Sequence, residues 1–302
     1  MSNNEIVENE YMWNPWHGCH KCSEGCFHCY MYERDKNYGI NSNIVKMTKS
    51  GFRLPIQKIR NKDANTKQEK YELHYKIPSG STIMTCLTSD FFIEEADVWR
   101  HDAWEFIHER GDCLFEIITK RPQRIEQTLP DNWLDGWSNV LINVTAENEE
   151  RAWERIPILL DLPIKHKGIV IEPMLEKMDI RPFLSSGDIE IVTVGGESYN
   201  GFEGVARELR MEWVKDIKEQ CKYYDTPFYF HQTGTRLVLD NGKTIHINKR
   251  DEKNLAKFYN LDQKDAGGIN WETITAELEL HHRAEQAHNI YKQLTLSDLG
   301  IL

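Results

Sequence analysis

The chain has 302 residues, of which 40% are hydrophobic, and it carries a formal net charge of −11. This length and apolar content suffice for a buried core and exclude a disordered chain, and without any run of eighteen apolar residues no membrane-spanning helix is expected. The acidic balance is opposite to that of most non-specific nucleic-acid binders, and the polar start MSNNEIVENE is not a secretory signal. We therefore expect a cytoplasmic protein, with no membrane contact, whose thiols stay reduced.

A cysteine-rich segment lies near the N-terminus, directly after a short predicted strand at residues 10–13. The segment WNPWHGCHKCSEGCFHCY (13–30) contains Cys19, Cys22, Cys26 and Cys29 within eleven residues. A disulfide framework would be spread along a secreted chain, whereas these four thiols are clustered in a chain that we expect in the cytoplasm. The clustering therefore favours a metal site.

Two kinds of metal centre are open for these four thiols. A structural zinc ion usually takes two pairs of ligands separated by a longer loop, and here only three residues separate Cys22 from Cys26. An iron–sulfur cluster accepts closely spaced ligands from one loop. Cys22-x3-Cys26-x2-Cys29, followed by the aromatic Tyr30, has the spacing of radical S-adenosylmethionine (SAM) enzymes. Three cysteine ligands leave one iron of a [4Fe–4S] cluster free to bind SAM.

Beyond a polar, lysine-rich stretch at 46–80, which predicts a surface excursion, short apolar runs alternate with amphipathic helical patterns. The predicted strands are 82–87, 113–118, 139–144, 166–171, 189–194 and 227–230. The predicted helices include 96–110, 148–160 and 211–224, and Asn148 suits the N-cap of the second. Strands that alternate with helices form parallel sheets, so the pattern predicts an α/β fold.

Polar side chains follow every one of these strands. They are Ser89 and Asp90, Lys120 and Arg121, Glu147 and Asn148, Glu172, Gly195-Gly196-Glu197-Ser198, and His231 with Gln232. A (β/α) barrel builds its active site from such groups at the carboxyl ends of its strands. We therefore predict a TIM-like (β/α) barrel, partial or complete, in preference to an open doubly wound sheet.

The chemistry of these groups suggests their roles. Asp90, Glu147 and Glu172 can bind the ribose hydroxyls or amino group of SAM, or a substrate. Lys120 and Arg121 can hold a carboxylate or phosphate. Salt bridges among these charges are the alternative. The catalytic candidates are Lys120, Arg121, Glu172 and His231, with His231 as a proton donor. Cofactor contacts are predicted for Ser89, Asp90, Glu147, Asn148, Gly195, Gly196, Glu197 and Ser198.

The motif Gly195-Gly196-Glu197-Ser198 allows two interpretations. It is similar to the glycine-glycine-glutamate motif that contacts the SAM amino group in radical-SAM barrels, although here it follows a late strand. A tight turn that ends in a capping serine is the alternative. Further along, Asp240-Asn241-Gly242 predicts the turn of a β-hairpin. The expected domains are a barrel with the cysteine loop at 1–250 and a mostly helical extension at 251–302, with its helical pattern around 274–294.

The chain also resembles the phage-derived three-cysteine-motif family, which is radical-SAM-like. The resemblance covers about residues 11–250 and rests on WNP (13–15), GC (18–19), Ser23, GC (25–26), CY (29–30), TSDFF (88–92), TKRP (119–122), TAEN (145–148), EP (172–173), GGES (195–198) and QTG (232–234). The cysteines of that family correspond to Cys19, Cys26 and Cys29. Cys19 and Cys22 are therefore rivals for the third ligand.

The resemblance implies a radical-SAM-like barrel that holds a [4Fe–4S] cluster and reductively cleaves SAM with the help of an electron donor. The cleavage would start hydrogen-atom abstraction from a substrate that the sequence does not identify. A structural zinc- or cluster-binding phage or defence factor is the alternative. Such a factor would act with a separately encoded partner protein or with nucleic acid.

Overall fold

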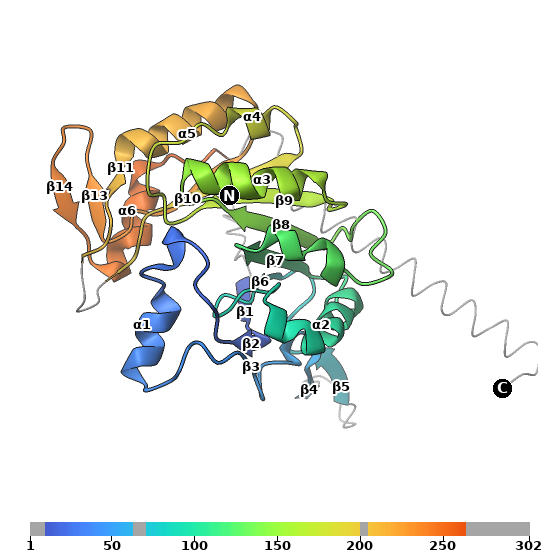
Figure 1. Ribbon diagram of the computed structural model, residues 1–302. Helices are drawn as coiled ribbons and strands as arrows, with labels where there is room; N and C mark the ends of the chain where they lie inside the picture. Colours follow the sequence, from blue (N-terminus) through green and yellow to red (C-terminus); the bar gives the residue numbers. More distant parts are fainter. Residues whose placement is uncertain (1–9, 63–70, 200–204, 264–302) are drawn as a thin grey trace, which may run out of the picture.

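The centre of the molecule is a curled sheet of seven parallel strands that forms a half-barrel (Figure 1). The computed structural model describes residues 10–62, 71–199 and 205–263. In the order of pairing, the strands are β1 (Glu10–Trp13), β6 (Thr82–Thr85), β7 (Leu114–Thr119), β8 (Val140–Thr145), β9 (His166–Ile171), β10 (Ile189–Gly195) and β12 (Phe228–Gln232). Each predicted strand is confirmed, and so is the prediction of a partial TIM-like barrel.

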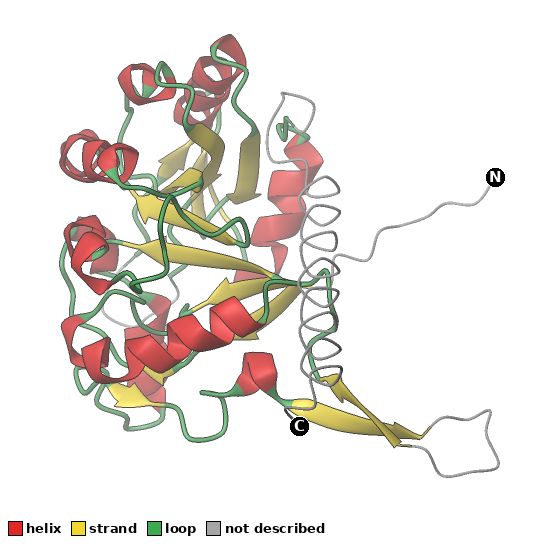
Figure 2. Ribbon diagram, turned by 90° about the vertical axis from the view of Figure 1, so that its right-hand side faces the viewer, coloured by secondary structure: helices red, strands yellow, loops and turns green. Residues whose placement is uncertain are grey.

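Helices cover one face of this sheet (Figure 2). They include α2 (Asp97–Glu109), α3 (Glu149–Asp161), the short α4 (Arg181–Leu184) and α5 (Met211–Tyr223). Each long helix turns an apolar stripe toward the strands, as Ala152, Ile156 and Leu159 do in α3, where all three are buried. The β-branched residues that point to this face, such as Ile142 and Ile169, are also fully buried and complete the core.

The opposite, inner face of the half-barrel carries polar groups. Glu116 of β7 and Asn143 of β8 lie on it, and the Asn143 amide donates a hydrogen bond of 2.7 Å to the Glu116 carboxyl. Successive side chains of a strand point to opposite faces, so half-buried Glu116 alternates with Phe115 and Ile117, which are buried against the helices. The inner face and the carboxyl edge of the sheet are therefore where polar chemistry is concentrated.

The smaller elements surround the two ends of the sheet. They are β2 (Trp16–His17) paired with β3 (Lys46–Met47), helix α1 (Tyr30–Asn37), β4 (Lys58–Lys62) paired with β5 (Tyr71–Tyr75), β11 (Leu209–Arg210) with β13 (Arg236–Val238) and β14 (Thr244–His246), and helix α6 (Glu252–Tyr259). The predicted hairpin is confirmed, because β13 and β14 are antiparallel. The excursion at 46–80 contains three short strands that its polar sequence did not predict.

In the part that the structure describes, the chain after residue 250 packs against the sheet. Helix α6 packs against β12, and Gln263 forms a bridge with Phe228 of that strand. The helical pattern around 274–294 lies outside the described residues. Among the described helices, none is long and apolar enough to cross a membrane.

Candidate functional site

The cysteine loop, residues 18–29, lies at the carboxyl ends of β1 and β6. The Gly18 amide donates a 3.1 Å hydrogen bond to the carbonyl of Thr88, and the Ser89 hydroxyl donates to the carbonyl of Gly18. Gly18 has a φ of +98°, and a Cβ atom there would lie 2.4 Å from the carbonyl oxygen of Ile44. Only glycine fits this entry to the loop. At its other end, Cys29 is the N-cap residue of α1.

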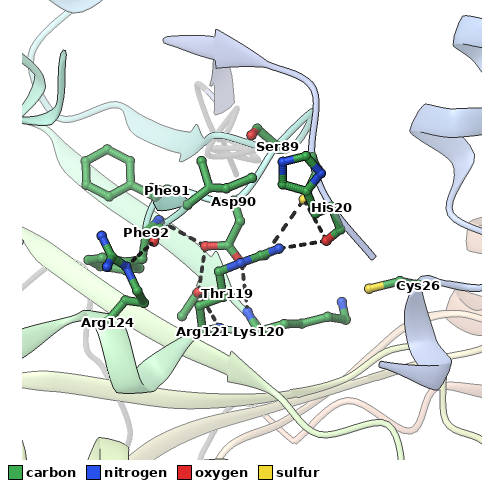
Figure 3. Close-up of polar contacts among 12 residues, drawn as sticks. His20, Cys26, Ser89, Asp90, Phe91, Phe92, Thr119, Lys120, Arg121 and Arg124 are labelled. Carbon is green, nitrogen blue, oxygen red and sulfur yellow. Dashed lines mark hydrogen bonds and ion pairs between the residues drawn. The ribbon is translucent and has the colours of Figure 1, made fainter. Parts of the chain in front are cut away.

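Asp90 and Arg121 fix the first part of the loop (Figure 3). The Arg121 guanidinium lies 3.1 Å from Asp90 Oδ2, and it donates to Cys19 Sγ at 3.7 Å and to the His20 carbonyl at 2.6 Å. The Thr119 hydroxyl donates to the other Asp90 oxygen at 2.8 Å. The ends of β6 and β7 thus hold Cys19 through one ion pair, whose charged hydrogen bonds are stronger than neutral ones.

Glu147 fixes the middle of the loop from the end of β8. Its side chain is fully buried and accepts a 3.1 Å hydrogen bond from the Gly25 amide. Arg155 of α3 donates to the second oxygen at 2.9 Å. Burial opposes ionisation of this carboxyl, but the positive charges of Lys120 and Arg155 hold its pKa below the usual value. Glu147 is therefore an ionised anchor.

Glu197, after β10, fixes the end of the loop. His28 Nδ1 lies 2.7 Å from Glu197 Oε2, and the Arg207 side chain donates to both oxygens of the same carboxylate. Arg207 also donates to the carbonyl of Glu24 at 2.9 Å, and the ring of Tyr199 stacks on that of His28 with 4.0 Å between centroids. Burial opposes ionisation, yet Arg207 lowers the pKa of Glu197.

Three of the predicted cofactor-binding residues thus share one structural role. Asp90, Glu147 and Glu197, here called the anchoring carboxylates, are each paired with an arginine. Glu147 and Glu197 contact the cysteine loop directly, and Asp90 holds it through Arg121. Of the three ion pairs, the one between Asp90 and Arg121 is a salt bridge of the kind predicted as the alternative from the sequence. Their cationic partners beyond Arg121 were not predicted, because Arg155 lies within α3 and Arg207 follows no strand.

The thiols of the loop differ in exposure and ionisation. Cys22 is exposed, whereas Cys19, Cys26 and Cys29 are half-buried. A hydrogen bond from the Cys22 thiol lowers the pKa of Cys26 to about 5, and the nearby charge of Lys120 acts in the same direction. The pKa of Cys22 rises correspondingly. Burial, followed by the charge of Asp90, raises the pKa of Cys19 to about 12. In the Cys22–Cys26 pair, the surroundings thus favour the thiolate form of Cys26.

A second cluster lies across the half-barrel, at the ends of β9 and β12. His231 Nδ1 lies 2.8 Å from Glu172 Oε2, and Gln232 donates to the other oxygen of Glu172. The Glu172 side chain lies over Gly195, where a Cβ atom would come within 2.5 Å of the carboxyl carbon. Burial opposes protonation of His231, but Glu172 prevails and raises its pKa. We call this pair the Glu172–His231 dyad.

A family model described as "Protein of unknown function (DUF5131)" matches residues 3–273. The chain belongs to the DUF5131 family. The matched range includes the cysteine loop, the anchoring carboxylates and the dyad. Neither the curated proteins nor the solved structures contain a match to this chain.

The other residues that the sequence predicted for the site do not form one cluster. Lys120 extends toward Cys26 (Figure 3). Asn148 accepts a 2.8 Å hydrogen bond from the Arg151 amide, which confirms it as the N-cap of α3. Gly196 donates to the carbonyl of Gln232 at 3.0 Å and joins the ends of β10 and β12. Ser198 is half-buried, and its hydroxyl has no hydrogen-bond partner among the described residues.

The donor chemistry of the DUF5131 loop suits an iron–sulfur cluster. Such clusters are held by cysteine thiolates, and a thiolate forms where cationic groups lie near a thiol. Lys120 and Arg121 are the cations beside Cys26 and Cys19. In the range that the structure covers, no three His, Cys, Asp or Glu side chains converge as an ion site.

Proposed function

We propose that this DUF5131 protein is a radical-SAM-type enzyme that binds a [4Fe–4S] cluster through its cysteine loop. The observation that carries the proposal is the position of this loop. The loop carries four closely spaced thiols at the carboxyl edge of a half-barrel, where Glu147 and Glu197 hold it directly and Asp90 holds it through Arg121. (β/α) barrels carry their active sites at that edge. The cysteine spacing and the resemblance of the motifs to a radical-SAM-like family support the same function.

The proposed ligands are Cys19, Cys26 and Cys29. Cys19 is held by its surroundings: its amide donates to the Ser42 carbonyl at 2.9 Å, and its own carbonyl accepts from the Tyr32 hydroxyl. Cys22, by contrast, is exposed. A side chain that is already fixed loses less conformational entropy when it binds. This difference favours Cys19 over Cys22 as the third ligand.

The residues of the chain would contribute orientation and charge. When bound, a [4Fe–4S] cluster with SAM supplies one-electron chemistry that yields a radical able to abstract a hydrogen atom. Lys120 and Arg121 place positive charge next to the thiols, which offsets the negative charge of thiolate ligands. In the dyad, Glu172 contacts Nδ1 of His231 and favours the protonated ring, which suits His231 as a proton donor to a substrate.

The test is anaerobic reconstitution of the protein with iron and sulfide, followed by reduction with dithionite in the presence of SAM. Dithionite replaces the electron donor. We expect 5′-deoxyadenosine and methionine as products. An intact cluster that yields no 5′-deoxyadenosine would contradict the proposal, and stoichiometric zinc without iron or sulfide after anaerobic purification would favour a structural metal site.

A further inference from the structure

Residues 46–62, here called the basic edge, concentrate positive charge on an acidic chain. The net charge of the whole chain is −11, yet this segment contains six lysines and arginines and no aspartate or glutamate. Like charges that lie close together repel one another, so a run without any acid requires an explanation. The structure describes five of the six side chains, and all five are exposed: Lys46, Lys49, Arg53, Lys58 and Arg60.

The acids of the protein do not neutralise these cations. Arg181, for comparison, is also exposed but lies 2.7 Å from an acidic neighbour. Four cations of the basic edge form no ion pair with any residue that the structure describes: Lys46, Lys49, Arg53 and Lys58. Two of them lie over aromatic rings instead, Arg53 over Phe106 and Lys58 over Tyr75. Their positive charge is therefore available to an external anion.

The first part of the basic edge is fixed along β1, the edge strand of the seven-stranded sheet. The indole of Trp13 in β1 donates to the carbonyls of Gly51 and Phe52, at 3.1 and 3.0 Å. Strand β3 pairs with β2 and places Lys46 opposite His17, which directly precedes the cysteine loop. The row of cations thus starts beside that loop and follows the edge of the half-barrel.

The second part of the basic edge is strand β4, which forms an antiparallel two-stranded ribbon with β5. The ribbon extends away from the body of the half-barrel (Figure 2, lower right). Its register places Lys58 opposite Tyr75 and Arg60 opposite Leu73. Residues that lie opposite each other, and residues two apart in one strand, share a face, so both cations lie on the same face of the ribbon.

The base of the ribbon is held by Arg110, which is fully buried. Its guanidinium donates to the carbonyls of Pro55 and Ile77, which flank the ribbon on either side. Glu109 accepts a 2.8 Å hydrogen bond from the hydroxyl of Tyr75, so this acid is engaged at the base. The ribbon is therefore anchored to the body, and its projection is a property of the fold.

We propose that the basic edge binds double-stranded DNA, with Lys46, Lys49 and Arg53 at backbone phosphates and the β4–β5 ribbon in the major groove. A row of unpaired cations complements the regularly repeated phosphates of a duplex. The major groove of B-DNA admits a two-stranded β-ribbon, whereas that of duplex RNA is too deep and narrow. The acidic remainder of the chain repels DNA, which confines the contact to this surface. The proposal goes beyond the radical chemistry and does not rest on it.

The first experiment measures the binding of a fluorescent DNA duplex by anisotropy. It uses the full chain without cluster reconstitution, so that the result is independent of radical activity. We expect a dissociation constant of about 10⁻⁶–10⁻⁴ M that rises with salt between about 50 and 200 mM. The double variant Lys46→Gln/Lys49→Gln should bind at least about tenfold more weakly, and the slope of log K against log salt should fall by about 2.

The matched control for this experiment is the double variant Lys177→Gln/Lys222→Gln. It makes the same change of charge at two exposed lysines on and beside α5, at the other edge of the sheet. We expect its affinity for the duplex to equal that of the wild type. No binding by the wild type, or equal binding by the two double variants, would overturn the proposal.

The second experiment tests the fit of the ribbon by competition. We expect the DNA duplex to compete at least about tenfold better than duplex RNA of the same sequence, because of the difference in groove width. Lys58→Gln should weaken binding of the DNA duplex by about three- to tenfold and reduce this preference. Equal competition by duplex RNA or by single-stranded DNA would contradict insertion into the groove. Equal competition by polyglutamate would indicate an acidic protein partner and overturn the proposal.

Discussion

At the scale of single residues, the buried carboxyl groups fall into two sets: those that hold the cysteine loop and those that lie outside it. The anchoring carboxylates are paired with arginines, and they hold the cysteine loop directly or, for Asp90, through Arg121. Glu172 is paired with His231, and Glu252 has no described hydrogen-bond partner. The positions of Asp90, Glu147, Glu172 and Glu197 after strands were predictable from sequence, and that of Glu252 at the start of α6 was not. Their partners were not, because a contact such as His28 with Glu197 joins residues far apart in the chain.

Arg121 provides a test of the anchoring role. Arg121→Gln removes the ion pair with Asp90 and the donors to Cys19 and His20. We expect the unfolding free energy to fall by about 1–3 kcal/mol. We also expect amide hydrogen exchange in residues 18–29, followed by mass spectrometry, to become faster because the loop is held less firmly. Arg181→Gln is the control, since its pair with Asp179 is exposed and contributes little. Unchanged hydrogen exchange in the loop would contradict the anchoring role.

The raised pKa of Glu116 predicts that the free energy of unfolding depends on pH. Burial, followed by the negative charge of Glu10, raises its pKa from the usual 4.5 to about 7. The folded state therefore keeps a proton that the unfolded state loses, so this stabilisation is full below pH 4.5 and is lost as the pH rises to about 7. The loss is at most about 3 kcal/mol.

The measurement for Glu116 is urea denaturation of wild type and Glu116→Gln between pH 4.5 and 8. Gln cannot ionise, so we expect the variant to gain stability relative to wild type as the pH rises through this range. The amide of Asn143 donates to Glu116, and Gln can accept the same hydrogen bond. A stability difference that does not vary with pH would exclude the raised pKa.

At the scale of elements, the strands were predictable because their β-branched apolar runs have few alternatives in a sheet covered by helices. The strands β4 and β5 were not predictable, because their sequences KIRNK and YELHY are polar and are typical of exposed loops. Helix α1 was missed for a similar reason, since it buries only Met31 and Asp35 among its eight residues. Tertiary contacts decide such elements, and sequence periodicity does not.

The end of β10 offers a test at this scale. A Cβ atom in Gly195→Ala would come within 2.5 Å of the Glu172 carboxyl and displace it from His231. We expect the pKa of His231, followed by NMR titration, to fall, since Glu172 is what raises it. Gly111→Ala is the control, because its nearest neighbour would be an ordinary 3.7 Å away. An unchanged pKa of His231 would mean that the substitution does not separate Glu172 from His231.

At the scale of the whole molecule, the barrel includes α6. That helix packs against β12, the edge strand, and carries Glu252 to the strand ends. We expect truncation after residue 250 to lower the melting temperature by several degrees or to prevent folding, because it removes α6 with its buried Ala256 and exposes the part of β12 that this helix covers. Truncation after residue 273, where the family match ends, is the control. Equal melting temperatures would place α6 outside the folding unit.

The three anchoring carboxylates have a consequence for the order of events during synthesis. The cysteine loop is complete once Cys29 has left the ribosome, but its anchors follow at Asp90, Glu147 and Glu197, and the last arginine is Arg207. Each strand of the sheet pairs with the one made before it, so the anchors become available one at a time. The loop is therefore made first and immobilised last, which leaves an interval in the nascent chain when the thiols are not yet held by their anchors.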